Sequence, residues 1–222
     1  DAKENTLVFD FGMKYNVFIN DQRLNVTYND KLILGEIILK CSFSRMLNVE
    51  YVPAEIEREE NKIKINFIRK KSTIYDEVRY AFLELEEVGT SLKVSFNALA
   101  SRYNFLAHGA AHICFTMPEG TAGALALDSV VPCWMNVSFP QGMGELKESV
   151  DSLAFKVNSI DVHVLPLSND NTASRVCADG LRISPRNNGA SEIHSTVMCV
   201  TASDDPYKAV HEGFVNMKQS GD

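Results

Sequence analysis

The residues with the clearest potential for chemistry are a cluster of metal-ligand types, His108, His112 and Cys114. On a helix, His108 and His112 would share one face at the i, i+4 spacing of metal sites, and Cys133 or His163 could join Cys114 in completing the site. A glycine directly after His108 weakens such a helix, and no glutamate follows His108 as zinc proteases require. The favoured interpretation is a loop histidine before a strand that carries His112 and Cys114 on one face. We therefore expect no metal and no cofactor, with these three residues as the weak metal candidates.

A second pattern is Asp161 and His163, two residues apart in a segment that alternates like a strand. This spacing puts a carboxylate beside an imidazole, which orients the ring and prepares a general base. Ser195, Cys177 or Cys199 could be proposed as the nucleophile, but no G-x-S-x-G elbow is present. A solvent-facing polar pair on an amphipathic strand is the favoured interpretation, so no catalytic residue is predicted.

The balance of charge excludes one large class of function. The chain of 222 residues has 22 Lys and Arg against 29 Asp and Glu, a net charge of −7, whereas general nucleic-acid binding needs a positive surface. The charge is uneven, because residues 1–100 carry 14 basic and 16 acidic groups and residues 101–222 carry the remaining 8 and 13. A broad nucleic-acid surface is excluded, but a local one is not.

One local basic patch consists of Arg69, Lys70 and Lys71. It follows an acidic segment at 55–60 and an alternating segment at 62–69, which together predict a hairpin with an acidic tip and a basic stem. Edge strands use such charges to resist aggregation; the alternative is a contact with an acidic partner or RNA. We expect nucleic acid only through this patch or through an arm that preceded Asp1.

Residues 130–135 contain the only tryptophan, Trp134, and are apolar on both faces. The segment predicts an inner strand or an interface strand, with Trp134 as its anchor. Packing in the core is favoured, and burial of Trp134, Met135 and Phe139 in a protein interface is the alternative. Prolines at 132 and 140 disfavour a regular central strand throughout.

The dominant hydrophobic period along the chain is two, which is typical of strands. Turn-forming pairs such as Asp179-Gly180 and Asn188-Gly189 separate the alternating segments. Strands are expected at residues 6–11, 15–20, 23–28, 49–52, 62–69, 112–117, 130–139, 155–167, 181–183 and 193–201. We predict a single domain over residues 1–222, an antiparallel β-sandwich or jelly-roll-like barrel with two to four short peripheral helices.

Helices are expected in four places. Residues 203–206 supply a cap and a first-turn proline before Tyr207, Val210, Phe214 and Met217, which share a helical face. Residues 73–88 fit a helix that ends at Gly89 better than a strand. Residues 145–155 and 98–108 are the other candidates.

The cysteines and the glycosylation sequons bear on the cellular location of the protein. The five cysteines are widely spaced without a C-x-x-C pair, which favours buried reduced thiols. Asn25 and Asn136 each begin a glycosylation sequon, which weakly indicates an extracellular environment instead. No window is apolar enough to span a membrane and no signal peptide is visible. The location is therefore open: virion or host cytoplasm for a coat protein, extracellular if the sequons are used.

Two main functional classes follow. The first is a non-enzymatic structural or assembly protein, a virus-type coat or shell subunit that acts through protein surfaces as a homo-oligomer. The alternative is an extracellular or cell-surface module that binds a glycan or a protein. A metal- or His-dependent enzyme is the third and least favoured class.

Overall fold

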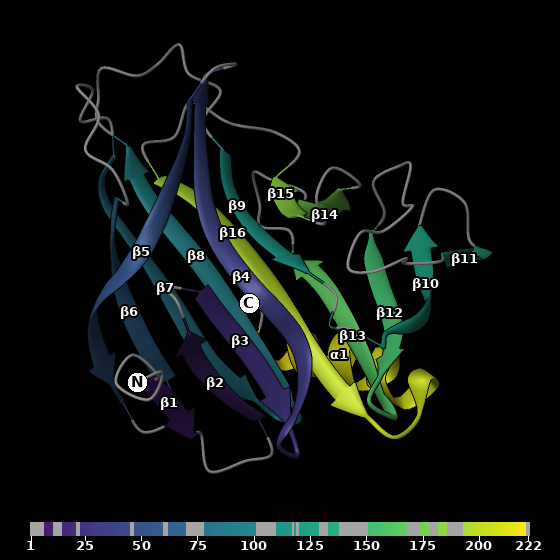
Figure 1. Ribbon diagram of the computed structural model, residues 1–222. Helices are drawn as coiled ribbons and strands as arrows, with labels where there is room; N and C mark the ends of the chain where they lie inside the picture. Colours follow the sequence, from purple (N-terminus) through teal and green to yellow (C-terminus); the bar gives the residue numbers. More distant parts are fainter. Residues whose placement is uncertain are drawn as a thin grey trace.

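Two antiparallel β-layers pack face to face, with one helix on the outside of the larger layer (Figure 1). The computed structural model describes residues 7–10, 15–20, 23–44, 47–59, 62–69, 78–100, 110–116, 118, 120–128, 133–137, 151–167, 174–177, 182–185 and 193–220. These residues form sixteen strands and one helix. The prediction of a mainly β fold is confirmed, and its architecture is consistent with a β-sandwich.

The smaller layer is formed around one long strand, β4. On one side of β4, the strands follow in the order β3, β2 and β1. On the other side they follow in the order β9, β15 and β14. The strands are β1 (Leu7–Asp10), β2 (Tyr15–Asn20), β3 (Arg23–Tyr28), β4 (Lys31–Ser44), β9 (Ala110–Thr116), β14 (Ser174–Cys177) and β15 (Arg182–Pro185).

The larger layer runs in the order β5-β6-β7-β8-β16-β13-β12-β10-β11. The second half of β4 also pairs with β5, so this strand connects the two layers. The strands are β5 (Leu47–Arg58), β6 (Lys62–Arg69), β7 (Val78–Val88), β8 (Ser91–Ala100), β10 (Ala122–Asp128), β11 (Cys133–Val137), β12 (Ser152–Val157), β13 (Ile160–Leu167) and β16 (Ile193–Ser203).

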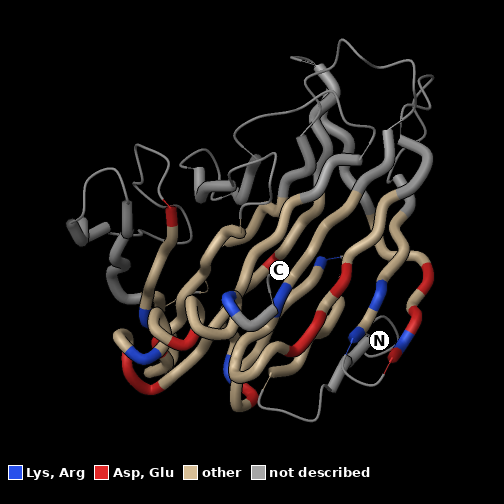
Figure 2. The backbone as a smooth tube through the Cα atoms, turned by 180° about the vertical axis from the view of Figure 1, so that it is seen from behind, with Lys and Arg blue, Asp and Glu red and all other residues tan. Residues whose placement is uncertain are grey.

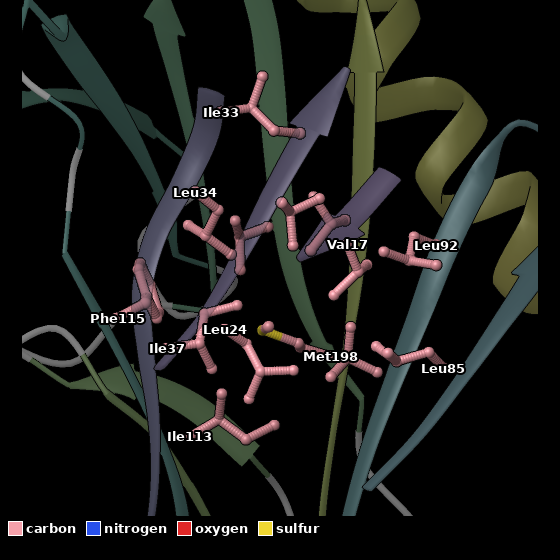
Figure 3. Packing of buried hydrophobic residues seen from close by; sticks show 14 of the residues in the cluster. Val17, Leu24, Ile33, Leu34, Ile37, Leu85, Leu92, Ile113, Phe115 and Met198 are labelled. Carbon is pink, nitrogen blue, oxygen red and sulfur yellow. The ribbon is translucent and has the colours of Figure 1, made fainter. Parts of the chain in front are cut away.

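The hydrophobic core fills the space between the layers (Figure 3). Strand alternation explains its composition: along β6, Ile63, Ile65 and Phe67 are buried while Lys62 and Lys64 are partly exposed. Both layers contribute large aliphatic side chains that are almost fully buried, among them Val17, Leu24, Ile33, Leu34 and Ile37 from the smaller layer and Leu85, Leu92 and Met198 from the larger.

Strands β13 and β16 are buried on both faces, because the helix α1 (Pro206–Ser220) covers their outer side. On β13, Val162 and Val164 join the sandwich core, whereas the alternate residue Leu165 packs with Cys199 and Met217 beneath the helix. Polar residues on the outer face of these strands are therefore removed from solvent.

The start of α1 confirms the predicted cap. The Asp205 Oδ1 atom accepts hydrogen bonds from the backbone N–H groups of Tyr207 at 2.8 Å and Lys208 at 3.1 Å, and Pro206 occupies the first helical position.

Of the four residues expected to share one helical face, only Met217 is buried. Tyr207 is 79% exposed and Phe214 is 47% exposed, whereas Ala209, Gly213 and Asn216 face the sheet together with Met217. Small residues on this side let the helix lie close to the strands, which selects that face over the larger apolar one.

The other expected helices are corrected where the structure describes them. Within 73–88, the residues Val78–Val88 form β7, because Ala81, Leu83 and Leu85 alternate into the core and the strand pairs on both edges. Within 145–155, residues 152–155 belong to β12, and within 98–108, residues 98–100 end β8. Residues 73–77, 145–150 and 101–108 lie outside the described residues. One helix is thus present in the described part of the chain, where two to four were expected.

The segment expected as one strand at 155–167 is a hairpin. Asn158 and Ser159 have φ of 50° and 63° and connect β12 to β13. Successive left-handed residues are the signature of the tight turns that join antiparallel strands.

Candidate functional site

A pocket of about 860 Å³ lies at the turn end of the sandwich. It is bordered by the β3–β4 turn, the β7–β8 turn, the β12–β13 turn and the junction from β16 into α1. Its lining is Tyr15, Tyr28, Asn29, Lys31, Thr90, Ser159, Ile160, Ala202, Ser203, Asp204, Lys208 and Glu212. The volume falls in the usual range for small-molecule sites.

Two hairpin turns hold this end together across the layers. The Lys31 Nζ atom donates to the Asn158 carbonyl oxygen at 3.4 Å, and the Asn158 Nδ2 atom donates to the Leu32 carbonyl oxygen at 3.0 Å. Asn29 and Asp30, with φ of 49° and 63°, form the partner turn between β3 and β4. The pocket is thus built from segments that are distant in sequence.

Tyr15 forms a structural wall of the pocket. Its hydroxyl donates to the Thr90 carbonyl oxygen at 2.8 Å and accepts from the Ala202 backbone N–H at 2.6 Å, which ties β2 to the larger layer. Burial raises the pKa of this phenol well above its usual value and outweighs the opposing effect of the Ala202 hydrogen bond, so it stays protonated. The Tyr28 ring lies beside it, with centroids 5.1 Å apart.

Four charged side chains line the pocket, and their charges balance. Lys31 and Lys208 are positive, whereas Asp204 and Glu212 are negative. Lys208 and Glu212 are four residues apart on α1, which places them on the same side of the helix. A pocket with no net charge and many hydrogen-bonding groups favours a neutral polar ligand over a multiply charged one.

A polar network runs from an exposed hydrogen bond at the pocket to buried hydrogen bonds beneath α1. The Thr90 hydroxyl donates to the Glu212 Oε2 atom at 3.0 Å, and the Asn216 Nδ2 atom donates to the Thr90 Oγ1 atom at 3.0 Å and the Ser91 Oγ atom at 2.7 Å. The Ser91 and Thr201 hydroxyls are 2.6 Å apart. Sequence reasoning missed this network because its members come from three separate elements.

Gly89 makes room for the network at the β7–β8 turn. Its φ is +59°, and a side chain there would collide with the Asn216 amide. This glycine was expected to end a helix, but it turns a hairpin instead.

His163 is fully buried beneath α1 and does not line the pocket. Its ring nitrogens have no hydrogen-bond partner within the described ranges, and its ring centroid is 5.8 Å from that of Phe214. Burial lowers the pKa of the imidazole to about 4, so the ring is neutral.

Asp161 is also buried, and its pKa is raised by burial more than Lys156, 4.0 Å away, lowers it. The expectation of a solvent-facing pair of Asp161 and His163 is wrong, since α1 covers this face.

The metal candidates are not brought together as a helical pair. His112 lies on β9, where its backbone faces Lys40, and Cys114 is half-buried on the same strand. This confirms residues 112–116 of the strand predicted at 112–117 and excludes the i, i+4 helix; residue 117 and His108 lie outside the described residues. Among the residues that the structure describes, no three His, Cys, Asp or Glu side chains form a metal-binding group.

The interface and basic-patch candidates stay predictions. Trp134 and Met135 lie on β11, which pairs with β10 at the end of the larger layer, so the segment is an edge strand in the described fold. Phe139, Lys70 and Lys71 lie outside the described residues, and only the backbone of Arg69 is placed, at the end of β6.

The predicted charged hairpin is confirmed as β5–β6. It closes with a hydrogen bond of 2.8 Å from the Glu59 N–H to the Lys62 carbonyl oxygen. Figure 2 shows acidic and basic residues close together along this edge of the sandwich.

The asparagine of the first glycosylation sequon makes a hydrogen bond within the fold. Asn25 is buried, and its Oδ1 atom accepts a hydrogen bond of 3.1 Å from the Glu36 N–H, where β4 bulges. Separately, the described residues contain no helix with the length and apolar character of a membrane span.

Comparison with known proteins gives fold-level likeness only. No family model matches the sequence, and no curated protein matches it. Among solved structures, a Synechocystis sp. protein is 11% identical, with a TM-score of 0.46 and coverage of 90% of this chain and 96% of that one. A putative aldose 1-epimerase from Escherichia coli is 7% identical, with a TM-score of 0.46 and coverage of 89% and 98%. A galactose mutarotase related enzyme from Lactobacillus acidophilus is 10% identical, with a TM-score of 0.41 and coverage of 89% and 97%.

These findings correct the expected function. The similar structures include one described as a putative aldose 1-epimerase and one described as a galactose mutarotase related enzyme, so the expectation of a non-enzymatic virus-type coat or shell subunit is withdrawn. The coat prediction rested on the strand content and on missing motifs, and many unrelated functions share such β-rich architectures.

Proposed function

We propose that the pocket at the turn end binds a neutral, polyhydroxylated small molecule of about the size of a monosaccharide. The observation that carries this proposal is the lining, in which balanced charges, hydroxyl groups and an amide accompany an aromatic ring. Sugars present hydroxyls on their edges and C–H groups on their faces, and such a lining complements both.

Each lining group has a role in this proposal. Glu212 and Asp204 accept hydrogen bonds from ligand hydroxyls, while Lys31 and Lys208 donate to ligand oxygens. The Tyr28 ring packs against the apolar face of the ligand. Tyr15 does not bind the ligand directly, because its hydroxyl is already used twice by the backbone.

The test is titration of the purified chain with neutral monosaccharides, uronic acids and sugar phosphates by calorimetry and ligand-observed NMR. We expect saturable binding of at least one neutral sugar and a loss of about tenfold or more in affinity in Tyr28→Leu, which removes the aromatic face. The matched control is Tyr207→Leu on the exposed side of α1, which should leave affinity unchanged. Binding of only the anionic compounds, or of none, contradicts the proposal.

A second candidate function is turnover of the bound sugar. Its supporting observation is that a carboxylate and an ammonium, Glu212 and Lys208, line one pocket from adjacent turns of α1. Interconversion of sugar anomers needs one group that takes a proton from the anomeric hydroxyl and one that gives a proton to the ring oxygen. Polarimetry on freshly dissolved sugar should then show a rate above the spontaneous one that Glu212→Gln abolishes; an unchanged rate with the unaltered protein leaves binding as the function.

A further inference from the structure

We propose that Asn216 and Thr90 are positioning residues that hold the Glu212 carboxylate for a hydroxyl of the ligand. This inference rests on the proposed function, because it assigns Glu212 as the acceptor for the neutral sugar. Its own basis is the chain of hydrogen bonds that links the three side chains across two elements, exposed between Thr90 and Glu212 and partly buried between Asn216 and Thr90.

The direction of the hydrogen bonds follows from counting protons. A threonine hydroxyl has a single proton to donate. Since the Asn216 Nδ2 atom donates to the Thr90 Oγ1 atom, the Thr90 proton is directed at the Glu212 Oε2 atom, 3.0 Å away. The Asn216 amide thus fixes the donor direction of Thr90, and Thr90 fixes one carboxylate oxygen of Glu212.

The same amide fixes a second branch. It donates to the Ser91 Oγ atom, the Ser91 and Thr201 hydroxyls share a hydrogen bond, and the Thr201 Oγ1 atom lies 3.6 Å from the Cys199 sulfur. Burial raises the pKa of the Cys199 thiol, so this branch ends on a neutral group. Asn216 is therefore the branch point of a network with one end in the pocket and the other in the interior.

Burial makes the inner part of this network rigid. Ser91 and Thr201 are fully buried and Asn216 is 7% exposed, so an unmade hydrogen bond among these three would not be replaced by water. The outer hydrogen bond, between Thr90 and Glu212, is exposed. The bare backbone of Gly89 accommodates the Asn216 amide, with which a side chain at this position would collide. A fixed Asn216 gives Glu212 a fixed anchor, although Glu212 itself lies on a partly exposed side of α1.

The anchored carboxylate keeps a second oxygen for the ligand. Thr90 occupies the Oε2 atom, and within the described ranges no protein group donates a hydrogen bond to the Oε1 atom. A hydroxyl of the ligand can donate to this oxygen in a set orientation, which lowers the entropic cost of binding. A negatively charged group at the same place would be repelled, which deepens the preference for neutral sugars.

The experiment is a double-mutant cycle on sugar affinity. Thr90→Val removes the hydroxyl and keeps the shape and the backbone carbonyl that Tyr15 uses, so we expect affinity to fall about fivefold to tenfold. Thr90→Ser restores the hydroxyl and should restore most of the affinity. In a Glu212→Gln background, Thr90→Val should have less than about a twofold further effect, because Thr90 acts through Glu212.

Controls separate positioning from stability. Thr27→Val removes another threonine hydroxyl with a backbone partner, the Asn16 carbonyl oxygen at 3.5 Å, away from the pocket lining, and should not change affinity. Asn216→Asp replaces the donor amide with an acceptor of the same shape, so it should reduce affinity as much as Thr90→Val. Equal effects of Thr90→Val in the unaltered protein and in the Glu212→Gln background overturn the proposal, since a purely structural role predicts that result.

A ligand-free measurement keeps the two proposals distinguishable. Side-chain NMR relaxation should show an ordered Glu212 carboxylate in the unaltered protein and increased motion in Thr90→Val and Asn216→Asp. Unchanged order in these variants overturns the positioning role even if sugar binds. If no neutral sugar binds, the proposed function fails, and the relaxation result still decides whether Thr90 and Asn216 hold Glu212.

Discussion

The two faces of β13 and β16 are buried by different means. The inner face contacts the smaller layer through aliphatic residues such as Val162 and Val200, whereas the outer face meets α1 through His163, Thr201 and Cys199. The inner face gains its stability from the removal of apolar surface from water. The outer face uses small and polar residues whose partners must be placed individually, and it leads directly to the pocket. The difference indicates that the inner face sets the stability of the fold and the outer face sets the geometry of the site.

The largest expected effect tests the inner face. Phe96 on β8 is fully buried between the layers, so Phe96→Ala should lower the free energy of unfolding by about 3–5 kcal/mol. Urea denaturation measures this loss. The control Tyr207→Ala removes an aromatic ring that is 79% exposed, and it should change stability by less than about 0.5 kcal/mol. Similar losses in both variants would contradict the stabilising role of burial between the layers.

The second effect is a pH dependence that arises from the outer face. The unfolded chain protonates His163 near its ordinary pKa of 6.5, but the folded chain does so only near 4. Between these values the unfolded state binds more protons, so stability falls as the pH is lowered from neutral to 4, by up to about 3 kcal/mol. Urea denaturation at several pH values measures the slope.

His163→Met should remove most of this slope, and the exposed His211→Met should not. Asp161 contributes in the opposite sense, because its raised pKa means that stability is lost as the pH rises above the ordinary value of 3.8. Its contribution is present in both variants, so the difference between them isolates His163. The same slope in His163→Met and the unaltered chain would contradict the assignment.

The smallest effect tests the close approach of α1. A Cβ atom at Gly213 would lie 2.9 Å from the His163 Nδ1 atom and 3.1 Å from the Thr201 Oγ1 atom. Gly213→Ala should therefore destabilise the fold by about 1–2 kcal/mol, despite the better helix propensity of alanine. Thermal denaturation measures the loss. His163→Ala provides the missing space, so the double variant should lose less than the sum of the single ones; strict additivity would count against this contact.

The parts that the sequence predicts well are those fixed by local pattern. Residues 62–69 alternate cleanly and form β6 with the predicted bounds, and the Asp205 and Pro206 signal places the start of α1. The helix predicted over residues 78–88 is wrong, because Val78, Phe82 and Leu85 fit a helical period while Ala81, Leu83 and Leu85 fit the strand period that the structure shows. Pairing with β6 and β8 decides between the two periods, and it is not visible locally.

The candidate site could not be found from spacing. Its lining includes Asn29, Thr90, Ser159 and Glu212, which no motif connects. Sequence reasoning instead singled out Asp161 and His163, whose two-residue spacing is correct for one face of a strand. That face is covered by α1, so the pair is buried and neither residue lines the pocket. The position of a covering helix depends on the tertiary fold. The alternation of residues along a strand does not indicate it.

The hydrogen bonds between the β3–β4 turn and the β12–β13 turn have a consequence for the order of folding. Lys31 and Asn158 are separated by 127 residues, so their contact closes a long loop and belongs among the slow, non-local steps of folding. The same two turns border the pocket. The pocket can therefore form only after the two layers have docked. A ligand that binds in the pocket therefore recognises the fully folded chain and no partly folded intermediate. In pulse-labelling experiments, the appearance of ligand binding should mark the end of folding.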